Sequence, residues 1–163
     1  QFCRKNAAII PINKVTFIGI VHLITNSSGY GPSMLEDSGV KLQYQISCKL
    51  LCKSTTVWEE GNGEDKRRIG SIVEWSVVVA PSGPPGDVCK TYLRFSHGFD
   101  SVFEIVSLGI DFGLISKKGS WFEYTDSLGE LIKEQGQSKL VNYFNNNKME
   151  LELLYEQIKE SAV

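Results

Sequence analysis

The chain has 163 residues, of which 42% are hydrophobic and 22% charged, and its formal net charge is −2. This composition is typical of one or two globular domains, and it excludes a strong overall positive field, so that a nucleic-acid site would have to be local. No apolar run approaches the roughly 20 residues that a membrane span needs, and no membrane contact is expected.

The N-terminal residues indicate a helix, an interior strand and a loop. Residues 2–10, FCRKNAAII, form a plausible helix that ends near Pro11, and an opening inside a helix suggests the later part of a longer or processed protein. Residues 15–23 are rich in β-branched side chains without polar alternation, which predicts a strand covered on both faces. After Thr25 the chain turns to Asn, Ser, Gly and Pro, which predicts a loop, poorly ordered over residues 25–38.

Three further strands are expected in the middle of the chain. Residues 40–53 mix apolar and polar side chains and should become a strand by Tyr44. Residues 59–68 form a charged turn with two glycines. Residues 69–80 and 87–95 then read as two strands joined by the turn PSGPPG, so that the three strands favour an antiparallel meander at a sheet edge.

The four cysteines show no metal-ligand spacing. Cys48 and Cys52 would share one face of a strand at about 13 Å, which is too far for a disulfide. Buried free thiols in a reducing compartment are therefore expected.

The composition shifts near Gly98, where we expect a domain boundary. Residues 101–115 carry apolar side chains at helical spacing, and residues 121–124 read as a short hairpin strand. Residues 138–147 and 148–162 read as two helices, the second with Leu151, Leu154, Tyr155 and Ile158 on one face.

Residues 99–144 carry several motifs in a fixed order: Leu108-Gly109-Ile110, Leu114-Ile115, the run from Lys118 to Tyr124, and the run from Gly136 to Leu140. Their order and spacing resemble the small C-terminal domain of RecA-type recombinases, including the phage UvsX branch. In that family an LGV…LI.K.GAWY.Y run is followed by GQGKA. The match is looser over residues 1–98, but the order of the elements persists.

The resemblance implies an α/β fold in two parts. Residues 1–98 would be the later part of a RecA-like ATPase core, with its strands largely in one mixed sheet and an antiparallel meander beside it. Residues 99–163 would be the small RecA-like C-terminal domain.

The resemblance also gives the loop after residue 25 a role, because the equivalent loop in the family lines the filament axis and holds single-stranded DNA. Backbone N–H groups and small polar side chains would contact phosphates, and a larger side chain would wedge between bases. The phosphate candidates are Asn26, Ser27, Ser28, Gly29 and Gly31, and the base candidates are Tyr30, Met34 and Leu35. The loop carries Glu36 and Asp37 and no Lys or Arg, which weakens its attraction for phosphates.

Two residues resemble nucleotide contacts of the family. His22, where relatives carry Gln or His, resembles a sensor of the ATP γ-phosphate, and imidazole can donate the hydrogen bond that this task needs. A strand-end histidine bonded to a neighbouring carbonyl is the alternative. Phe95 matches an aromatic position beside the adenine of ATP, and a core phenylalanine is the alternative.

The small domain offers a possible basic surface. Lys117, Lys118, Lys133 and Lys139 could form the surface on which the family guides duplex DNA, although lysines among this many acidic residues more often form a solvated face. Trp121 and Tyr124 are expected in the core of the small domain rather than as stacking platforms.

Two departures from the family pattern concern ATP. The sequence contains no G-x-x-x-x-G-K-[ST], so this chain has no phosphate-binding loop of that type and is expected to be inactive alone. Relatives carry two basic residues that reach a neighbouring subunit's ATP site, and these positions fall on Ala80 and Ser82. Lys90 and Arg94 are possible substitutes.

The leading hypothesis is therefore part of a RecA-like recombinase in DNA recombination and repair. The complete protein would bind single-stranded DNA as a cytoplasmic filament that uses ATP and Mg for homologous pairing and strand exchange, and duplex DNA is a further candidate partner. The alternative is a non-catalytic RecA-fold interaction or DNA-binding protein that has lost the ATPase. A helicase-like or clock-type ATPase fits less well, because a small domain follows Gly98.

Overall fold

The computed structural model describes residues 9–37, 46–61, 63–81 and 85–162. By its contacts the chain divides into two units, one made of residues 1–50 and 77–85 and the other of residues 51–76 and 86–163. Among the described residues, no helix is long and apolar enough to cross a membrane.

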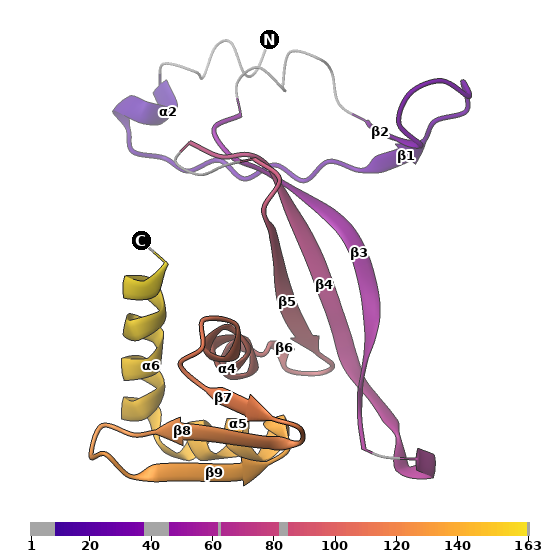
Figure 1. Cartoon of the computed structure of the whole chain (residues 1–163). Helices are drawn as coiled ribbons and strands as arrows, with labels where there is room; N and C mark the ends of the chain where they lie inside the picture. The colour runs from indigo at the N-terminus through magenta and orange to yellow at the C-terminus, as the bar shows by residue number, and fades with distance from the viewer. Residues whose placement is uncertain (1–8, 38–45, 62, 82–84, 163) are drawn as a thin grey trace. The chain divides into compact units, whose positions relative to one another are not determined.

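The first unit contains short elements. Helix α2 spans Ile9–Ile12, strand β1 spans Leu23–Thr25 and strand β2 spans Met34–Glu36 (Figure 1). The two strands pair antiparallel, with Ile24 opposite Leu35. Most of the helix predicted over residues 2–10 lies outside the described residues.

The interior strand predicted over residues 15–23 is wrong in its extent and burial. Only Leu23 belongs to β1, and residues 15–20 adopt neither helix nor strand. The side chains of Ile18 and Ile20 are 83% and 91% exposed. An apolar strand is interior only where other strands flank it and helices cover it, and none of the described sheets includes residues 15–20.

A four-stranded sheet follows in the order β3-β4-β5-β6 (Figure 1). Its strands span Lys49–Glu60, Arg67–Val79, Val88–Arg94 and Gly98–Phe99, and a 3-10 turn, Gly63–Asp65, lies between the first two. The strands and the charged turn predicted between residues 59 and 95 are thereby confirmed. The strand predicted to form by Tyr44 begins only at Lys49, because residues 46–48 are described and are not strand, whereas residues 44 and 45 lie outside the described residues.

The α/β class is confirmed, but the single mixed sheet is wrong. The described strands form three separate sheets of two, four and three strands. The pairs β1–β2, β4–β5 and β5–β6 are antiparallel, and so are both strand pairs of the three-stranded sheet in the C-terminal residues. Short turns between sequential strands produce this arrangement, because a parallel pair needs a long crossover connection.

The C-terminal residues form three helices and a three-stranded sheet. Helix α4 spans Ser101–Asp111, α5 spans Gln137–Asn146 and α6 spans Lys148–Ser161. The strands β7, β8 and β9 span Ser116–Lys118, Trp121–Thr125 and Leu131–Gln135. Asp100 caps α4 by accepting a hydrogen bond from the Phe103 N–H at 3.0 Å, which satisfies one of the unpaired N–H groups of the first turn.

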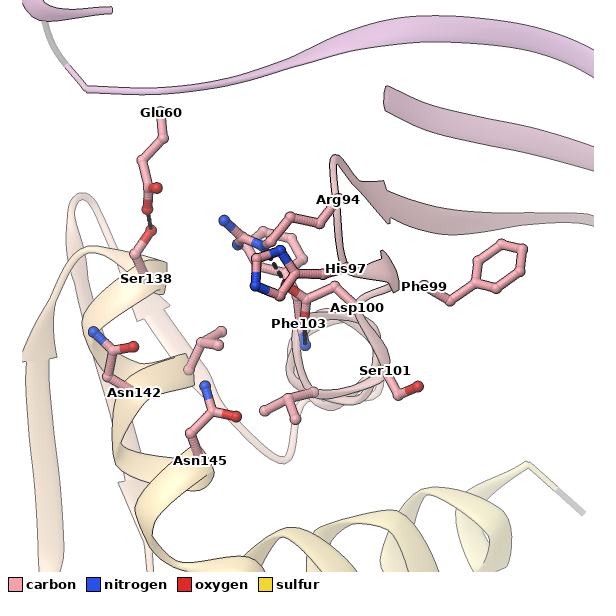
Figure 2. A pocket seen from close by; sticks show the side chains of 12 residues that line it. Glu60, Arg94, His97, Phe99, Asp100, Ser101, Phe103, Ser138, Asn142 and Asn145 are labelled. Atoms are coloured by element: carbon pink, nitrogen blue, oxygen red, sulfur yellow. Dashed lines mark hydrogen bonds and ion pairs between the residues drawn. The ribbon is translucent and has the colours of Figure 1, made fainter. Parts of the chain in front are cut away.

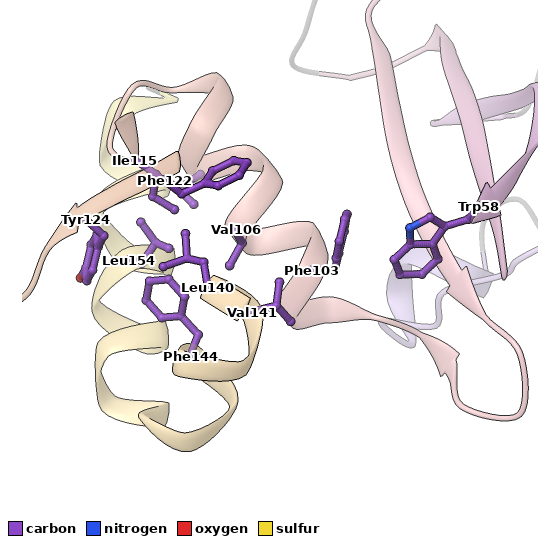
Figure 3. Close-up of a cluster of buried hydrophobic side chains, with 11 residues drawn as sticks. Trp58, Phe103, Val106, Ile115, Phe122, Tyr124, Leu140, Val141, Phe144 and Leu154 are labelled. Atoms are coloured by element: carbon purple, nitrogen blue, oxygen red, sulfur yellow. The ribbon is translucent and has the colours of Figure 1, made fainter. Parts of the chain in front are cut away.

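The buried core lies in the second unit (Figure 3). Its aliphatic and aromatic centre comes from the C-terminal helices and strands, and Trp58 of β3 joins it through Phe103, at 4.7 Å between ring centroids. Gly70 makes room for this indole, because a Cβ there would lie 2.9 Å from Trp58 Cε3. The core residues are Trp58, Phe103, Val106, Ile115, Phe122, Tyr124, Leu140, Val141, Phe144, Leu154 and Ile158. Independent folding of residues 99–163 as a domain stays a prediction.

One carboxylate is buried in this unit. The Glu150 carboxylate accepts hydrogen bonds from the Tyr124 hydroxyl at 3.0 Å and from the Ser127 N–H at 3.2 Å, and also from the Ser127 hydroxyl. Burial, with the neighbouring Glu150, raises the pKa of Tyr124. The carboxylate therefore ties the turn between β8 and β9 to helix α6.

Several side chains are more exposed than the sequence predicted. Trp121 is 41% exposed and Tyr155 is 43% exposed, so neither is a core residue, whereas Tyr124 is buried as expected. Cys48, Cys52 and Cys89 are free thiols as predicted but exposed rather than buried, since they lie on or beside strands with an open face.

Candidate functional site

The loop assigned to DNA forms the tip of the β1–β2 hairpin, and Asn26 organises it. The Asn26 amide donates to the carbonyls of Tyr30 and Pro32 at 2.6 and 2.8 Å, and its oxygen accepts from the Ser28 N–H at 3.0 Å and from the Ser28 hydroxyl at 2.6 Å. Gly29 and Gly31 have φ angles of 74° and 84°, a conformation that favours glycine. The sequence predicted a loop that is poorly ordered over residues 25–38 and missed this ring of hydrogen bonds, and the order of the loop in the absence of DNA stays a prediction.

The predicted base-contacting residues lie on the same hairpin. Tyr30 is 88% exposed at the tip, and Met34 and Leu35 are roughly half exposed on β2. An exposed aromatic ring on a tip held by Asn26 can stack on an unpaired base. The acidic residue nearest the loop is partly compensated, because Glu36 forms an ion pair with Lys49. The structure therefore brings the predicted loop residues together on one hairpin.

His22 precedes β1 and is exposed, and its carbonyl accepts a hydrogen bond from the Asp37 N–H at 2.9 Å. The residue thus stands at the base of the same hairpin. Its proposed role toward a phosphate stays a prediction.

The predicted lysines lie on the second unit. Lys117 and Lys118 are on β7, Lys133 is on β9, and Lys139 is on α5. Glu123 holds Lys118 and Lys133 at 2.8 and 2.9 Å, and these two hydrogen bonds hold the pKa of Glu123 low, at about 2. The carboxylate is ionised at neutral pH, so it offsets part of the positive charge that the lysines contribute.

The residues predicted to contact or replace contacts to ATP form a less complete set than the residues of the hairpin. Phe95 is 47% exposed, which removes the core alternative, and the Arg68 guanidinium lies 5.3 Å from its ring centroid. Arg94 is committed elsewhere, because its Nε donates to Asp100 at 2.8 Å and its guanidinium lies 4.6 Å from the Trp58 ring centroid. Ala80 carries no charge, and Ser82 lies outside the described residues. These residues and the absence of a phosphate-binding motif do not by themselves fit ATP.

A polar cavity of about 530 Å³ lies in the second unit beside Arg94 (Figure 2). Figure 2 shows the Asn142 and Asn145 amides of α5 facing the same space as Arg94 and His97. Its charged side chains have partners within the protein, since Arg94 pairs with Asp100 and the Ser138 hydroxyl donates a hydrogen bond to Glu60. Sequence reasoning missed this cavity, because no spacing motif joins residues of β5 and α5. Within the described residues, no cluster of His, Cys, Asp and Glu could hold a metal ion.

The sequence of this chain matches one family and several known proteins. Residues 103–163 match the family described as the RecA C-terminal domain. The chain is 31% identical over 150 residues to Protein RecA of Lactococcus lactis subsp. cremoris, a match that covers 91% of this chain and 38% of the relative. It is 30% identical over 159 residues to Protein RecA of Thermotoga neapolitana, which covers 96% of this chain and 42% of the relative.

A third relative, Protein RecA of Thermotoga maritima, is 25% identical over 146 residues, or 88% of this chain and 38% of the relative. The chain thus spans about two fifths of the length of these curated relatives. The resemblance stated from the sequence motifs is confirmed by relatives that align along most of the chain. The chain belongs to the RecA family and corresponds to the C-terminal part of its members.

Proposed function

We propose that this chain is part of a RecA-like recombinase and that its β1–β2 hairpin binds single-stranded DNA. In the complete protein, this binding would support ATP-coupled homologous pairing and strand exchange in DNA recombination and repair. We further propose a filament-forming protein of the cytoplasm that also contacts duplex DNA through Lys117 and Lys139 of the C-terminal unit. The whole activity is a proposal, because the chain spans about two fifths of its relatives.

The observation that carries the proposal is the hairpin tip. Asn26 bonds to Ser28, Tyr30 and Pro32 across the tip, while the Tyr30 ring stays 88% exposed. Each of these hydrogen bonds would reduce the conformational entropy that the loop has to lose when a base stacks on the ring. Met34 and Leu35 point to opposite faces of β2, so one of the two could add apolar surface for a second base.

Single-strand binding by this hairpin would depend weakly on charge. The segment from His22 to Asp37 contains no Lys or Arg, so few counterions would be released on binding. Ser27 and the loop glycines would contact phosphates through hydroxyl and backbone N–H groups, which carry no net charge, whereas both donors of Ser28 are engaged by Asn26. The affinity of one chain should therefore be low and should fall gently with salt.

ATP and Mg are proposed as cofactors of the complete protein, outside the residues of this chain. His22 and Phe95 are the two residues proposed to lie toward the nucleotide, and no step of the reaction is derived from them. The alternative function, a non-catalytic RecA-fold DNA-binding protein, is favoured by one observation. Arg94, which could have replaced the missing basic pair at Ala80 and Ser82, is engaged by Asp100 and Trp58.

The hairpin proposal can be tested by titrating a fluorescein-labelled dT oligonucleotide with the chain and with Tyr30→Ala. Loss of one stacked base, worth roughly 1–3 kcal/mol, should weaken binding about 5- to 140-fold. Tyr155→Ala is the matched control, because Tyr155 is also an exposed aromatic residue but lies on α6. Equal affinity of Tyr30→Ala and the unmodified chain would remove the hairpin from the DNA site.

A further inference from the structure

The outward face of the three-stranded sheet carries an exposed tryptophan among lysines. Phe122 and Tyr124 of β8 are buried, so the alternate residues Trp121, Glu123 and Thr125 point to the opposite face. The register places Lys118 of β7 and Gln135 of β9 opposite Trp121. Trp121 is 41% exposed, although a strand position of this kind is usually polar when it faces solvent.

The two lysines of this face are held in place by one carboxylate. The Glu123 side chain is only 15% exposed. Its carboxylate accepts hydrogen bonds from Lys118 of β7 and from Lys133 of β9. Lys133 also lies 5.6 Å from the centroid of the Trp121 ring. Each ammonium group has three N–H donors, so both lysines keep donors for a ligand after bonding Glu123.

The chemistry of this face fits an unpaired nucleotide better than the other anionic ligands. The two lysines and Glu123 leave one surplus positive charge, which is too little for a duplex held by its phosphates alone. A flat aromatic ring is useful to a ligand that exposes a π-face, and the bases of a duplex have their faces covered by stacking. An acidic peptide would gain from the charge but not specifically from the ring.

We propose that the outward face of the β7–β8–β9 sheet is a second single-strand site, in which Trp121 stacks on an unpaired base and Lys118 and Lys133 contact the adjoining phosphates. This proposal rests on the proposed function in that it takes DNA as the ligand. It adds a site on the second unit that is independent of the β1–β2 hairpin.

The test uses the full chain labelled with 5-fluorotryptophan and followed by fluorine NMR. The chain has three tryptophans, so three signals are expected, and the signal missing from Trp121→Phe identifies Trp121. Trp58 is buried, and the Trp75 indole donates to the Thr91 hydroxyl at 2.9 Å, so both serve as internal references. The probes are a dT dodecamer, a duplex of the same length and a dodecamer of glutamate.

The dT dodecamer should shift the Trp121 signal, while the Trp58 and Trp75 signals stay in place. In the Tyr30→Ala background, where binding is followed by the fluorescence anisotropy of a fluorescein-labelled dT dodecamer, Trp121→Ala should weaken dT binding about 5- to 140-fold, the factor expected for one lost base stack. Lys118→Ala and Lys133→Ala should each weaken it less. Lys159→Ala is the matched control, because Lys159 also lies near an exposed aromatic ring, that of Tyr155, at 4.4 Å.

The outcomes separate this site from the hairpin. A Trp121 signal that shifts with dT in the Tyr30→Ala variant supports the sheet site even if the hairpin proposal fails. An unmoved Trp121 signal in a chain that binds dT through Tyr30 overturns the sheet site and leaves the proposed function in place. An equal shift with duplex or with the glutamate dodecamer overturns the assignment to unpaired bases.

Discussion

Replacing Gly109 with alanine tests the packing of the C-terminal unit, because two effects of opposite sign compete at this position. Gly109 lies inside α4, where alanine is favoured over glycine by roughly 1 kcal/mol. The added Cβ would lie 2.9 Å from Ile115 Cδ1 and 3.2 Å from Leu154 Cδ1. Ile115 and Leu154 are 1% and 0% exposed, so neither has solvent to move into.

The steric effect should exceed the helical gain. Forcing a methyl group into a packed core costs typically about 1–3 kcal/mol. Subtracting the gain of roughly 1 kcal/mol leaves a net destabilisation of about 0–2 kcal/mol, with about 1 kcal/mol as the central value. Urea unfolding of the full chain measures this difference, and the buried Trp58, which packs on Phe103, provides the fluorescence signal.

A second substitution tests whether the 2.9 Å contact between the added Cβ and Ile115 Cδ1 causes the destabilisation. Ile115→Val removes the Cδ1 atom and should cost about 0.5–1.5 kcal/mol in the unmodified chain. In the Gly109→Ala background the same change removes the shorter contact and leaves the one with Leu154 Cδ1 at 3.2 Å, so it should cost less than in the unmodified chain. Equal costs of Ile115→Val in both backgrounds, or a Gly109→Ala chain more stable than the original, would refute the packing argument.

Four further predictions follow from other parts of the chain. Glu150→Gln should lower the free energy of unfolding by about 1–3 kcal/mol. Both carboxylate oxygens accept hydrogen bonds, and the NH₂ group of an amide would face a donor instead. A urea midpoint unchanged within error would contradict this. Glu123, whose pKa in the folded chain is about 2, contributes stability that is present above its unfolded pKa and lost as the pH falls through about 2. Glu123→Gln should therefore be less stable than the original chain at pH 7, and thermal melts should show the gap closing between about pH 5 and 2, whereas a constant gap would argue against the two lysine contacts. Ile18→Lys combined with Ile20→Lys should raise the concentration at which the chain aggregates, measured by light scattering, because both side chains are exposed in an apolar run; Lys14→Ala is the control. The purified chain should release no phosphate from ATP, and turnover that disappears in His22→Ala would contradict the expected lack of a complete nucleotide site.

The C-terminal half could be predicted well because its sequence signals are local. Helices α4, α5 and α6 follow from apolar residues at helical spacing, and each of these residues finds its partners within the same unit. Strand β8 follows from the aromatic residues between two glycines. Local patterns that are satisfied by nearby segments are the ones that a single sequence reveals reliably.

The N-terminal half shows the opposite case. Residues 15–20 have the composition of an interior strand, yet Ile18 and Ile20 are exposed. Composition reports only the preference of these side chains for burial, whereas burial itself requires strands at both edges and cover on both faces. The Asn26 hydrogen bonds were missed for a related reason, because the amide contacts residues up to six positions away and no spacing rule predicts that loop.

Trp121 shows which part of a site is readable from sequence and which part needs the structure. Strict alternation along β8 means that buried Phe122 and Tyr124 force Trp121 to the outward face, so the expectation that Trp121 and Tyr124 both lie in the core could not hold for residues three apart on one strand. The position of the lysines does not follow from the strand alone, because Lys118 and Lys133 come from different turns and meet at Glu123 only through the register of three strands. A one-residue shift of β9 would send Lys133 to the buried face and Ile132 to the outward one, which would cost the core an apolar side chain. The core therefore fixes the register, and the register in turn assembles the ring and the two cations on one surface.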